Sequence, residues 1–208
     1  MTPLEALSLA ALCFAGAASP GPSLAVVLAC CRSGGRSHGV IAAWAHASGV
    51  AVYALMTVFG FSAIVTARPA LFTALQLAGA AYLLWLAVGL LRGGKESEDP
   101  AHELNEQGAF SAAADGFAVA FLNPKLAVFM LALFSQFIRP DASPADNALL
   151  VLIATVVDGL WYTLIALLFT REAWLAALNR HARIVDKTFA VLLAGLAIYI
   201  LYGAVSAQ

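Results

Sequence analysis

Charged residues are scarce in this chain of 208 residues, of which only 11 % are Asp, Glu, Lys or Arg. A soluble globular domain usually carries about 25 % charged residues. Because 62 % of the residues are hydrophobic, the chain has too few polar side chains to cover a surface that faces water. The composition therefore excludes an ordinary soluble domain and predicts an all-α integral membrane protein whose main partner is the lipid bilayer.

Other absences narrow the range of functions. The net charge is −1 and no run of Lys or Arg is present, so nothing indicates a nucleic-acid partner. The three cysteines, Cys13, Cys30 and Cys31, fall in one apolar stretch near the N-terminus, without the spacing of a CxxC or zinc motif. We therefore expect no disulfide framework, metal site or cofactor. That first stretch is too long for a signal peptide and is expected to be a retained helix.

Long apolar stretches are abundant. A helix that spans a membrane needs about 20 mostly apolar residues, and six stretches qualify, at residues 4–31, 39–66, 70–91, 112–138, 147–170 and 188–205. The polar segment between the third and fourth spans divides the chain into a first repeat (1–92), a cytoplasmic linker (93–109) and a second repeat (110–208). Because three spans per half place the halves in opposite orientations, we predict six transmembrane helices in an inverted 3+3 repeat.

Two proline breaks interrupt matching spans of the two halves. The first is Ser19-Pro20-Gly21-Pro22, within the first span, and the second is Asn123-Pro124, within the fourth. Proline removes a backbone donor and clashes with the preceding turn, so both spans should be broken helices. Broken backbone survives at membrane depth only against protein or a polar cavity. Paired breaks of this kind predict a transporter's binding site near the middle of the membrane.

The loops predict an orientation. Six spans place both termini and two loops on one side of the membrane, where the only basic residues are Arg68 and Arg139. The opposite loops contain the larger basic set, namely Arg32, Arg36, Arg92, Lys95, Arg171, Arg180, Arg183 and Lys187. Because Lys and Arg favour the cytoplasmic side, both termini are expected to face outward.

Three ionisable residues fall inside the predicted spans. Lys125 follows the second break, Asp158 lies in the middle of the fifth span, and His46 lies in the second. A charge at the centre of a bilayer costs at least about 2.5–3.5 kcal/mol, so such a group usually faces a pathway or a partner. Lys125 and Asp158 could couple protons to transport or form a structural ion pair, and Lys125 could instead extend to the interface. His46 suits either a proton relay or a neutral hydrogen bond between helices.

The breaks suggest a zwitterionic ligand. Gly21 permits close approach of backbone, while Ser19, Ser23 and Asn123 offer side-chain donors and acceptors. Free N–H groups after Pro22 would favour a carboxylate, and the carbonyls before the proline breaks would favour an ammonium group. Trp161 and Tyr162 lie close enough to Asp158 in sequence to line the same pathway, and Trp161 is the favoured candidate.

The chain resembles the LysE/RhtB family of bacterial amino-acid exporters over nearly its whole length. Three blocks carry the resemblance. The first joins residues 18–23 (ASPGPS) to residues 32–39 (RSGGRSHG), the second is the run 77–86 (LAGAAYLLWL) with Arg92, and the third runs from Gly116 through residues 121–125 (FLNPK) to residues 134–137 (FSQF).

The resemblance implies proton-driven export of amino acids or close derivatives across the bacterial cytoplasmic membrane. It implies that Pro20, Gly21, Pro22, Asn123, Pro124 and Lys125 lie at the functional centre. Many members have an acidic residue after the glycine of the second span, where this chain has Val50 after Gly49. Asp158 is then the main expected proton carrier, with His46 a candidate for the missing role, and a neutral substrate is favoured over lysine or arginine.

Two rival functions have weaker support. A membrane-embedded enzyme would need facing cysteines, clustered arginines or metal ligands within the spans, so we expect that the protein is not an enzyme. A metal-ion exporter on the same scaffold would have only His46, Asp158, Met56 and Met130 as ligands, whereas transition metals prefer several His or Cys. Small-residue helix faces are compatible with a homodimer or with packing inside one chain.

Overall fold

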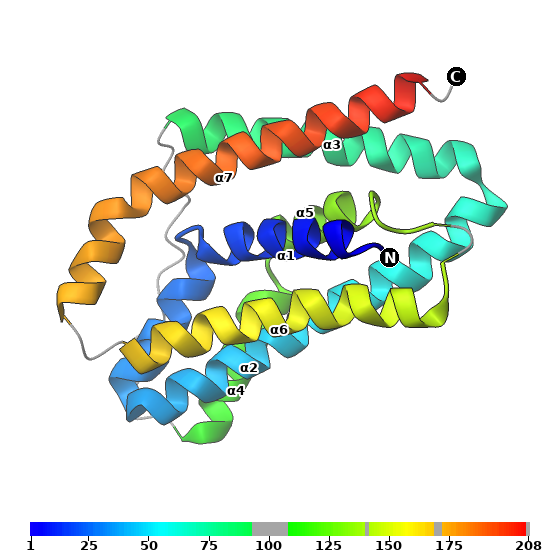
Figure 1. Cartoon of the computed structure of the whole chain (residues 1–208). Helices are drawn as coiled ribbons and strands as arrows, with labels where there is room; N and C mark the ends of the chain where they lie inside the picture. The colour runs from blue at the N-terminus through cyan, green and yellow to red at the C-terminus, as the bar shows by residue number, and fades with distance from the viewer. Residues whose placement is uncertain (93–107, 140–141, 169–171, 207–208) are drawn as a thin grey trace.

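The computed structural model describes residues 1–92, 108–139, 142–168 and 172–206. Every regular element in these ranges is an α-helix: α1 (Pro3–Ala18), α2 (Pro22–Ala67), α3 (Pro69–Arg92), α4 (Ala109–Phe121), α5 (Pro124–Phe134), α6 (Pro144–Leu168) and α7 (Glu172–Ser206). Figure 1 shows them as a layered bundle, elongated along the direction of the long helices. Residues 93–107 of the predicted linker lie outside the described residues.

Four helices are long and apolar enough to cross a membrane by themselves. The qualifying segments are Pro22–Gly60, Ala70–Arg92, Pro144–Leu168 and Arg183–Gly203. The pair α4 and α5 is bent by 58° at its break and adds a fifth span if it is counted as one. The described chain is therefore an all-helical protein of the multi-pass membrane type, while the predicted count of six spans and the inverted repeat stay predictions.

Both expected helix breaks are present. α1 ends at Ala18 and α2 begins at Pro22, and α4 ends at Phe121 before α5 begins at Pro124. α1 starts in a capping box, in which Thr2 and Glu5 exchange hydrogen bonds between side chain and backbone. With 16 residues, α1 is about 24 Å long at 1.5 Å per residue, which is shorter than a membrane core of about 30 Å.

The polar segment 32–38 contains the expected boundary between the first two spans, but the break is shorter than a loop. It lies inside α2, where only Gly34 and Gly35 leave helical geometry, and Gly35 has a φ of 74°. Glycine adopts this left-handed conformation without a Cβ clash, so two residues are enough to redirect the chain. Figure 1 shows the change of direction between the first part of α2, which leaves the end of α1, and the longer second part.

The sixth predicted span is part of a longer helix. The prediction began at residue 188, whereas α7 begins at Glu172. Hydropathy found the apolar part of this helix but not its charged first part, because charged side chains are compatible with a helix whose face is exposed. Arg180, Arg183 and Lys187 are exposed along this part of α7.

α2 and α4 cross at very short range. A Cβ added to Gly116 would lie 2.2 Å from the backbone oxygen of Ala42, and one added to Gly49 would lie 2.7 Å from the Cβ of Ala120. Small residues therefore bring the two backbones together, as is usual for helix packing in membranes. This crossing fixes α4, and with it the second break, against the second part of α2.

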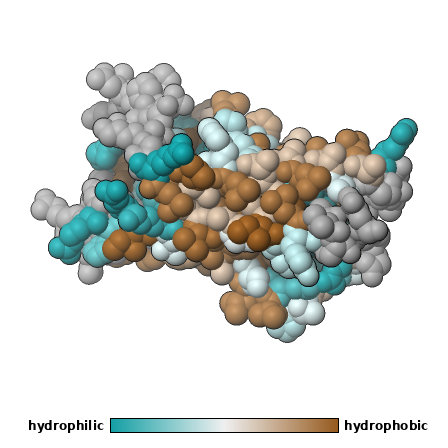
Figure 2. All heavy atoms as spheres, turned by 90° about the horizontal axis from the view of Figure 1, so that it is seen from above, coloured by the Kyte–Doolittle hydropathy of each residue, from teal (hydrophilic) through white to brown (hydrophobic). Residues whose placement is uncertain are grey.

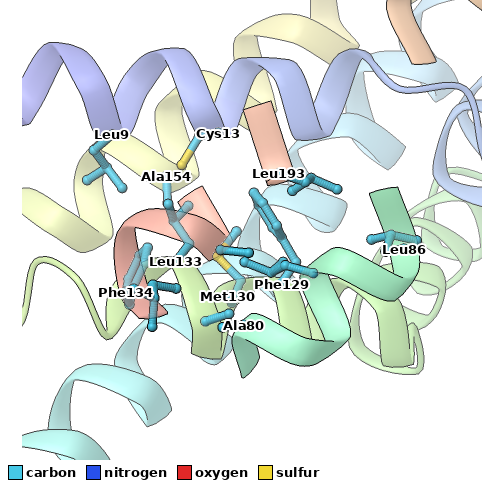
Figure 3. Packing of buried hydrophobic residues seen from close by; sticks show 14 of the residues in the cluster. Leu9, Cys13, Ala80, Leu86, Phe129, Met130, Leu133, Phe134, Ala154 and Leu193 are labelled. Carbon is cyan, nitrogen blue, oxygen red and sulfur yellow. The ribbon is translucent and has the colours of Figure 1, made fainter. Parts of the chain in front are cut away.

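The larger hydrophobic cluster joins helices from both halves of the chain. Figure 3 shows Leu9 and Cys13 of α1 facing Met130 of α5, Ala154 of α6 and neighbouring residues of the cluster. A smaller cluster surrounds the first part of α2 and includes residues of α4 and α6. The surface formed by α3 and α7 is hydrophobic along its middle, with hydrophilic residues toward its ends (Figure 2). This distribution fits a surface in contact with lipid.

Candidate functional site

The first break lies between the end of α1 and the start of α2. The α1 hydrogen-bond ladder ends where the Ser19 N–H donates to the Ala15 oxygen, at 3.2 Å. Pro22 is the first residue of α2, a position that suits proline because the first helical N–H has no partner within the helix. Ser19 and Ser23 therefore flank a short segment of non-helical backbone.

The second break is organised by the side chain of Asn123. Its Oδ1 accepts from the backbone N–H of Lys125 at 3.0 Å and from that of Leu126 at 3.2 Å. Asn123 is thus the N-cap of α5, with Pro124 at the first helical position. The sequence Asn-Pro-Lys therefore forms the start of α5, two residues after the end of α4.

Asn123→Ala is expected to destabilise the protein by about 1 kcal/mol, since this is the usual contribution of an N-cap side chain. The apparent melting temperature in detergent measures the effect. Asn123→Asp is the matched control, because a carboxylate keeps an acceptor at the same position and should retain most of the stability. An alanine variant that melts with the native protein would show that the cap contributes nothing.

A chain of hydrogen bonds connects the first break to α6. Nδ1 of His46 lies 2.7 Å from Oδ2 of Asp158, and its Nε2 lies 2.8 Å from Oγ of Ser23. All three residues are buried, with exposed fractions of 2 %, 7 % and 9 % for His46, Asp158 and Ser23. An ionised carboxylate only accepts, so Nδ1 of His46 then donates to Asp158, and a neutral His46 accepts the Ser23 hydroxyl on Nε2. These groups can hold one proton between them or pass it along.

A second carboxylate contacts the same break. The Ser19 hydroxyl donates to Oδ1 of Asp186 over 3.2 Å. The sequence analysis missed Asp186 because it lies before the predicted sixth span, in a segment expected to be a loop. In the structure it lies within α7, so Ser19 bonds an acidic residue of the second half directly, while Ser23 reaches one through His46.

A cavity lies between the two breaks. Its volume is about 60 Å³, which exceeds the roughly 10–15 Å³ that one water molecule needs. One part of its lining is polar, with Ser19, Ser23, His46, Asn123, Lys125, Asp158 and Tyr162. The rest is mainly apolar or backbone, with Cys13, Gly16, Ala17, Gly21, Pro22, Leu126, Phe129, Met130, Ala154 and Phe189. A lining that combines polar and apolar residues suits a small amphipathic molecule.

Most of the predicted site residues line this cavity. Pro20, Pro124 and Trp161 are not among the lining residues of the described chain. The ring of Trp161 instead packs edge-on against Phe14, with 5.1 Å between centroids. Tyr162, the other residue considered for the pathway, does line the cavity. Its spacing of four residues from Asp158 was the available signal, because residues i and i+4 share a helix face.

Lys125 and Asp158 both line the cavity, but the partner of Asp158 seen here is His46. The ammonium group of Lys125 lies 5.9 Å from the centroid of the Phe189 ring, which is within the range of a cation–π contact. Phe189 lies three residues after Asp186, on the same face of α7. Among the residues that the structure describes, no group of three or more His, Cys, Asp or Glu could hold a metal ion.

These helices and this buried polar site define a multi-pass integral membrane protein with an internal cavity between two broken helices. The family model described as LysE type translocator matches residues 14–204, and the chain belongs to this family. The resemblance found in the sequence is confirmed.

The individual relatives are only moderately similar to this chain in sequence. An uncharacterised membrane protein of Pseudomonas aeruginosa is 31 % identical over 79 % of this chain and 78 % of its own length. The threonine efflux protein of Salmonella typhi is 26 % identical, covering 88 % of this chain and 90 % of its own. The leucine efflux protein of an Enterobacter species is 29 % identical, covering 66 % of this chain and 65 % of its own length. No solved structure matches the chain significantly.

Proposed function

We propose that this protein exports small neutral amino acids across the bacterial cytoplasmic membrane and that protons drive the export. Membership of the LysE type translocator family supports transport, and relatives named as threonine and leucine efflux proteins support amino acids as the substrate class. The observation that carries the proposal is the buried chain Asp158–His46–Ser23, which ends at the first helix break.

The physical role of this chain follows from its burial. A carboxylate away from water is costly unless it is paired or protonated. In the state described here His46 compensates Asp158. When the cavity opens to the other side, water replaces this compensation and a proton can be exchanged. Alternating between these states would couple one proton movement to each change of access.

The lining of the cavity supports a zwitterionic substrate with an uncharged side chain. Lys125 and the N-terminal end of α2 are suited to a carboxylate, and the carbonyls at the ends of α1 and α4 are suited to an ammonium group. The one carboxylate among the lining residues, Asp158, already bonds His46. A lysine or arginine side chain would bring a second positive charge to a cavity that already contains Lys125.

The inverted repeat is part of the proposal. In it, α1 with the first part of α2 and α4 with α5 form corresponding broken spans, the second part of α2 corresponds to α6, and α3 corresponds to α7. The start of α1 and the end of α7 lie toward the same end of the molecule in Figure 1, which supports an even number of crossings. The excess of Lys and Arg in the loops supports outward-facing termini.

A binding screen followed by transport tests the proposal. Purified protein is heated in detergent with each of the twenty amino acids and with homoserine lactone, since a ligand of the folded state raises its apparent melting temperature. We expect neutral amino acids such as threonine or leucine to stabilise the protein more than lysine or arginine. Stabilising compounds should then move out of proteoliposomes against their gradient when a pH gradient is imposed. No stabilisation and no movement for any of them would contradict the proposal.

A further inference from the structure

Two tyrosine hydroxyls bind the backbone where the two half-helices end. The hydroxyl of Tyr162, in α6, donates to the backbone oxygen of Ala17 over 3.2 Å. Ala17 is the residue before the last residue of α1. Tyr53 of α2 donates to the oxygen of Phe121, over 2.6 Å, the last residue of α4. The relation is reciprocal, because each tyrosine lies in one half of the chain and its acceptor lies in the other.

The breaks leave these carbonyls without their usual helical partners. In a continuous helix the Phe121 oxygen would accept from the Lys125 N–H, but that N–H donates to Oδ1 of Asn123. In a continuous helix the Ala17 oxygen would accept from the Gly21 N–H, but Gly21 lies within the break. Lipid offers no replacement donor. Each tyrosine therefore supplies a hydrogen bond that the break itself removes.

The two tyrosines differ in what else they touch. The Tyr162 ring is 3 % exposed, lines the cavity and packs edge-on against His46, with 4.9 Å between centroids. Tyr53 is half-buried and stacks on the Phe121 ring at 5.5 Å. Tyr162 thus touches the proton-holding chain with its ring and the end of α1 with its hydroxyl.

We infer that Tyr162 is a positioning residue, which transmits changes at His46 and Asp158 to the end of α1, and that Tyr53 is its counterpart at the second break. In the state described here the hydroxyl of Tyr162 holds the end of α1 against α6. Movement of His46 shifts the Tyr162 ring, and the end of α1 moves with it. Only the transport consequence of this inference rests on the proposed export function.

The test removes one oxygen atom from each tyrosine of the full-length protein, in the variants Tyr162→Phe and Tyr53→Phe. Tyr199→Phe is the control, because Tyr199 is 66 % exposed on α7. The first readout is the rate at which a small maleimide labels Cys13, which lines the cavity, in a Cys30→Ala, Cys31→Ala background. We expect Tyr162→Phe to label at least about fivefold faster, the factor expected from one net hydrogen bond.

The second readout is amino-acid export by the same variants in proteoliposomes. Tyr162→Phe should lower the maximal rate by about fivefold or more, with little change in KM, because the hydroxyl bonds backbone and not the substrate. Tyr53→Phe should lower the maximal rate while labelling of Cys13 changes less, since Tyr53 is not among the residues lining the cavity.

Native labelling and a native maximal rate in Tyr162→Phe would overturn the inference, even if its melting temperature fell. The labelling readout does not depend on export. If the unmodified protein exports none of the amino acids, the proposed function fails, whereas faster labelling of Cys13 in Tyr162→Phe would still support the positioning role.

Discussion

Gly116→Ala is expected to prevent most of the protein from folding normally. The new methyl group would lie 2.2 Å from the Ala42 oxygen, 2.8 Å from its Cα and 2.9 Å from its carbonyl carbon. All three atoms belong to the backbone of α2, so no side-chain rotation relieves the clash. Overpacking in a well-packed interior costs about 1–3 kcal/mol and occasionally more. We place this substitution at or above the upper end of that range, because two helices would have to separate.

Gly195→Ala is the matched control. Nothing lies within 4 Å of a Cβ added to Gly195 in α7, and alanine is favoured over glycine inside a helix by about 0.5–1 kcal/mol. Folded yield and apparent melting temperature in detergent should fall sharply for Gly116→Ala and stay level or rise for Gly195→Ala. Equal yields and melting temperatures for the two variants would mean that the α2–α4 crossing is not as close as described.

The helix breaks could be predicted because their causes are local. Proline determines its own φ and lacks an N–H group, whatever surrounds it. The cap that Asn123 forms is equally local, because its side chain accepts from the backbone N–H of Lys125 two residues on, although the sequence analysis considered Asn123 only for substrate binding. The breaks are decided within a few residues, so sequence alone was sufficient to place them.

The partners of Asp158 could not be predicted in the same way. Charge made Lys125 the obvious candidate, but the hydrogen bond seen here goes to His46, which is 112 residues away. Which of two distant groups meets a carboxylate depends on how the helices pack, and packing is set by many small contacts such as Gly49 with Ala120. The sequence therefore identified residues that line the cavity, but it could not predict which of them contact each other.

Hydropathy also misjudged where helices begin and end. It reports apolar length, so it gave residues 32–38 as a loop, although only Gly34 and Gly35 leave helical geometry between the two helical parts of α2, and it shortened α7 by its charged first part. A helix is held together by backbone hydrogen bonds, and charged side chains on its exposed face do not disrupt them. Asp186 was missed for this reason.

Asp158→Asn is expected to abolish export driven by a pH gradient while leaving substrate exchange at equal pH. Asparagine keeps an oxygen that can accept a hydrogen bond from His46, so the cavity should retain its shape. Because asparagine cannot ionise, the variant lacks the group that is proposed to carry the coupling proton. We expect the driven rate to fall by at least about tenfold, which corresponds to about 1.4 kcal/mol in barrier height. Proteoliposomes containing a labelled amino acid measure both modes.

Asp146→Asn is the matched control for this prediction. Asp146 lies on the same helix, near its start, where it accepts hydrogen bonds from the backbone N–H and the hydroxyl of Ser143. Its substitution changes the net charge equally but should leave gradient-driven export at the native rate. If Asp158→Asn also exported at the native rate, Asp158 would not carry the coupling proton. If exchange were lost together with driven export, Asp158 would serve binding or structure, and the coupling would have to depend on another group in the cavity.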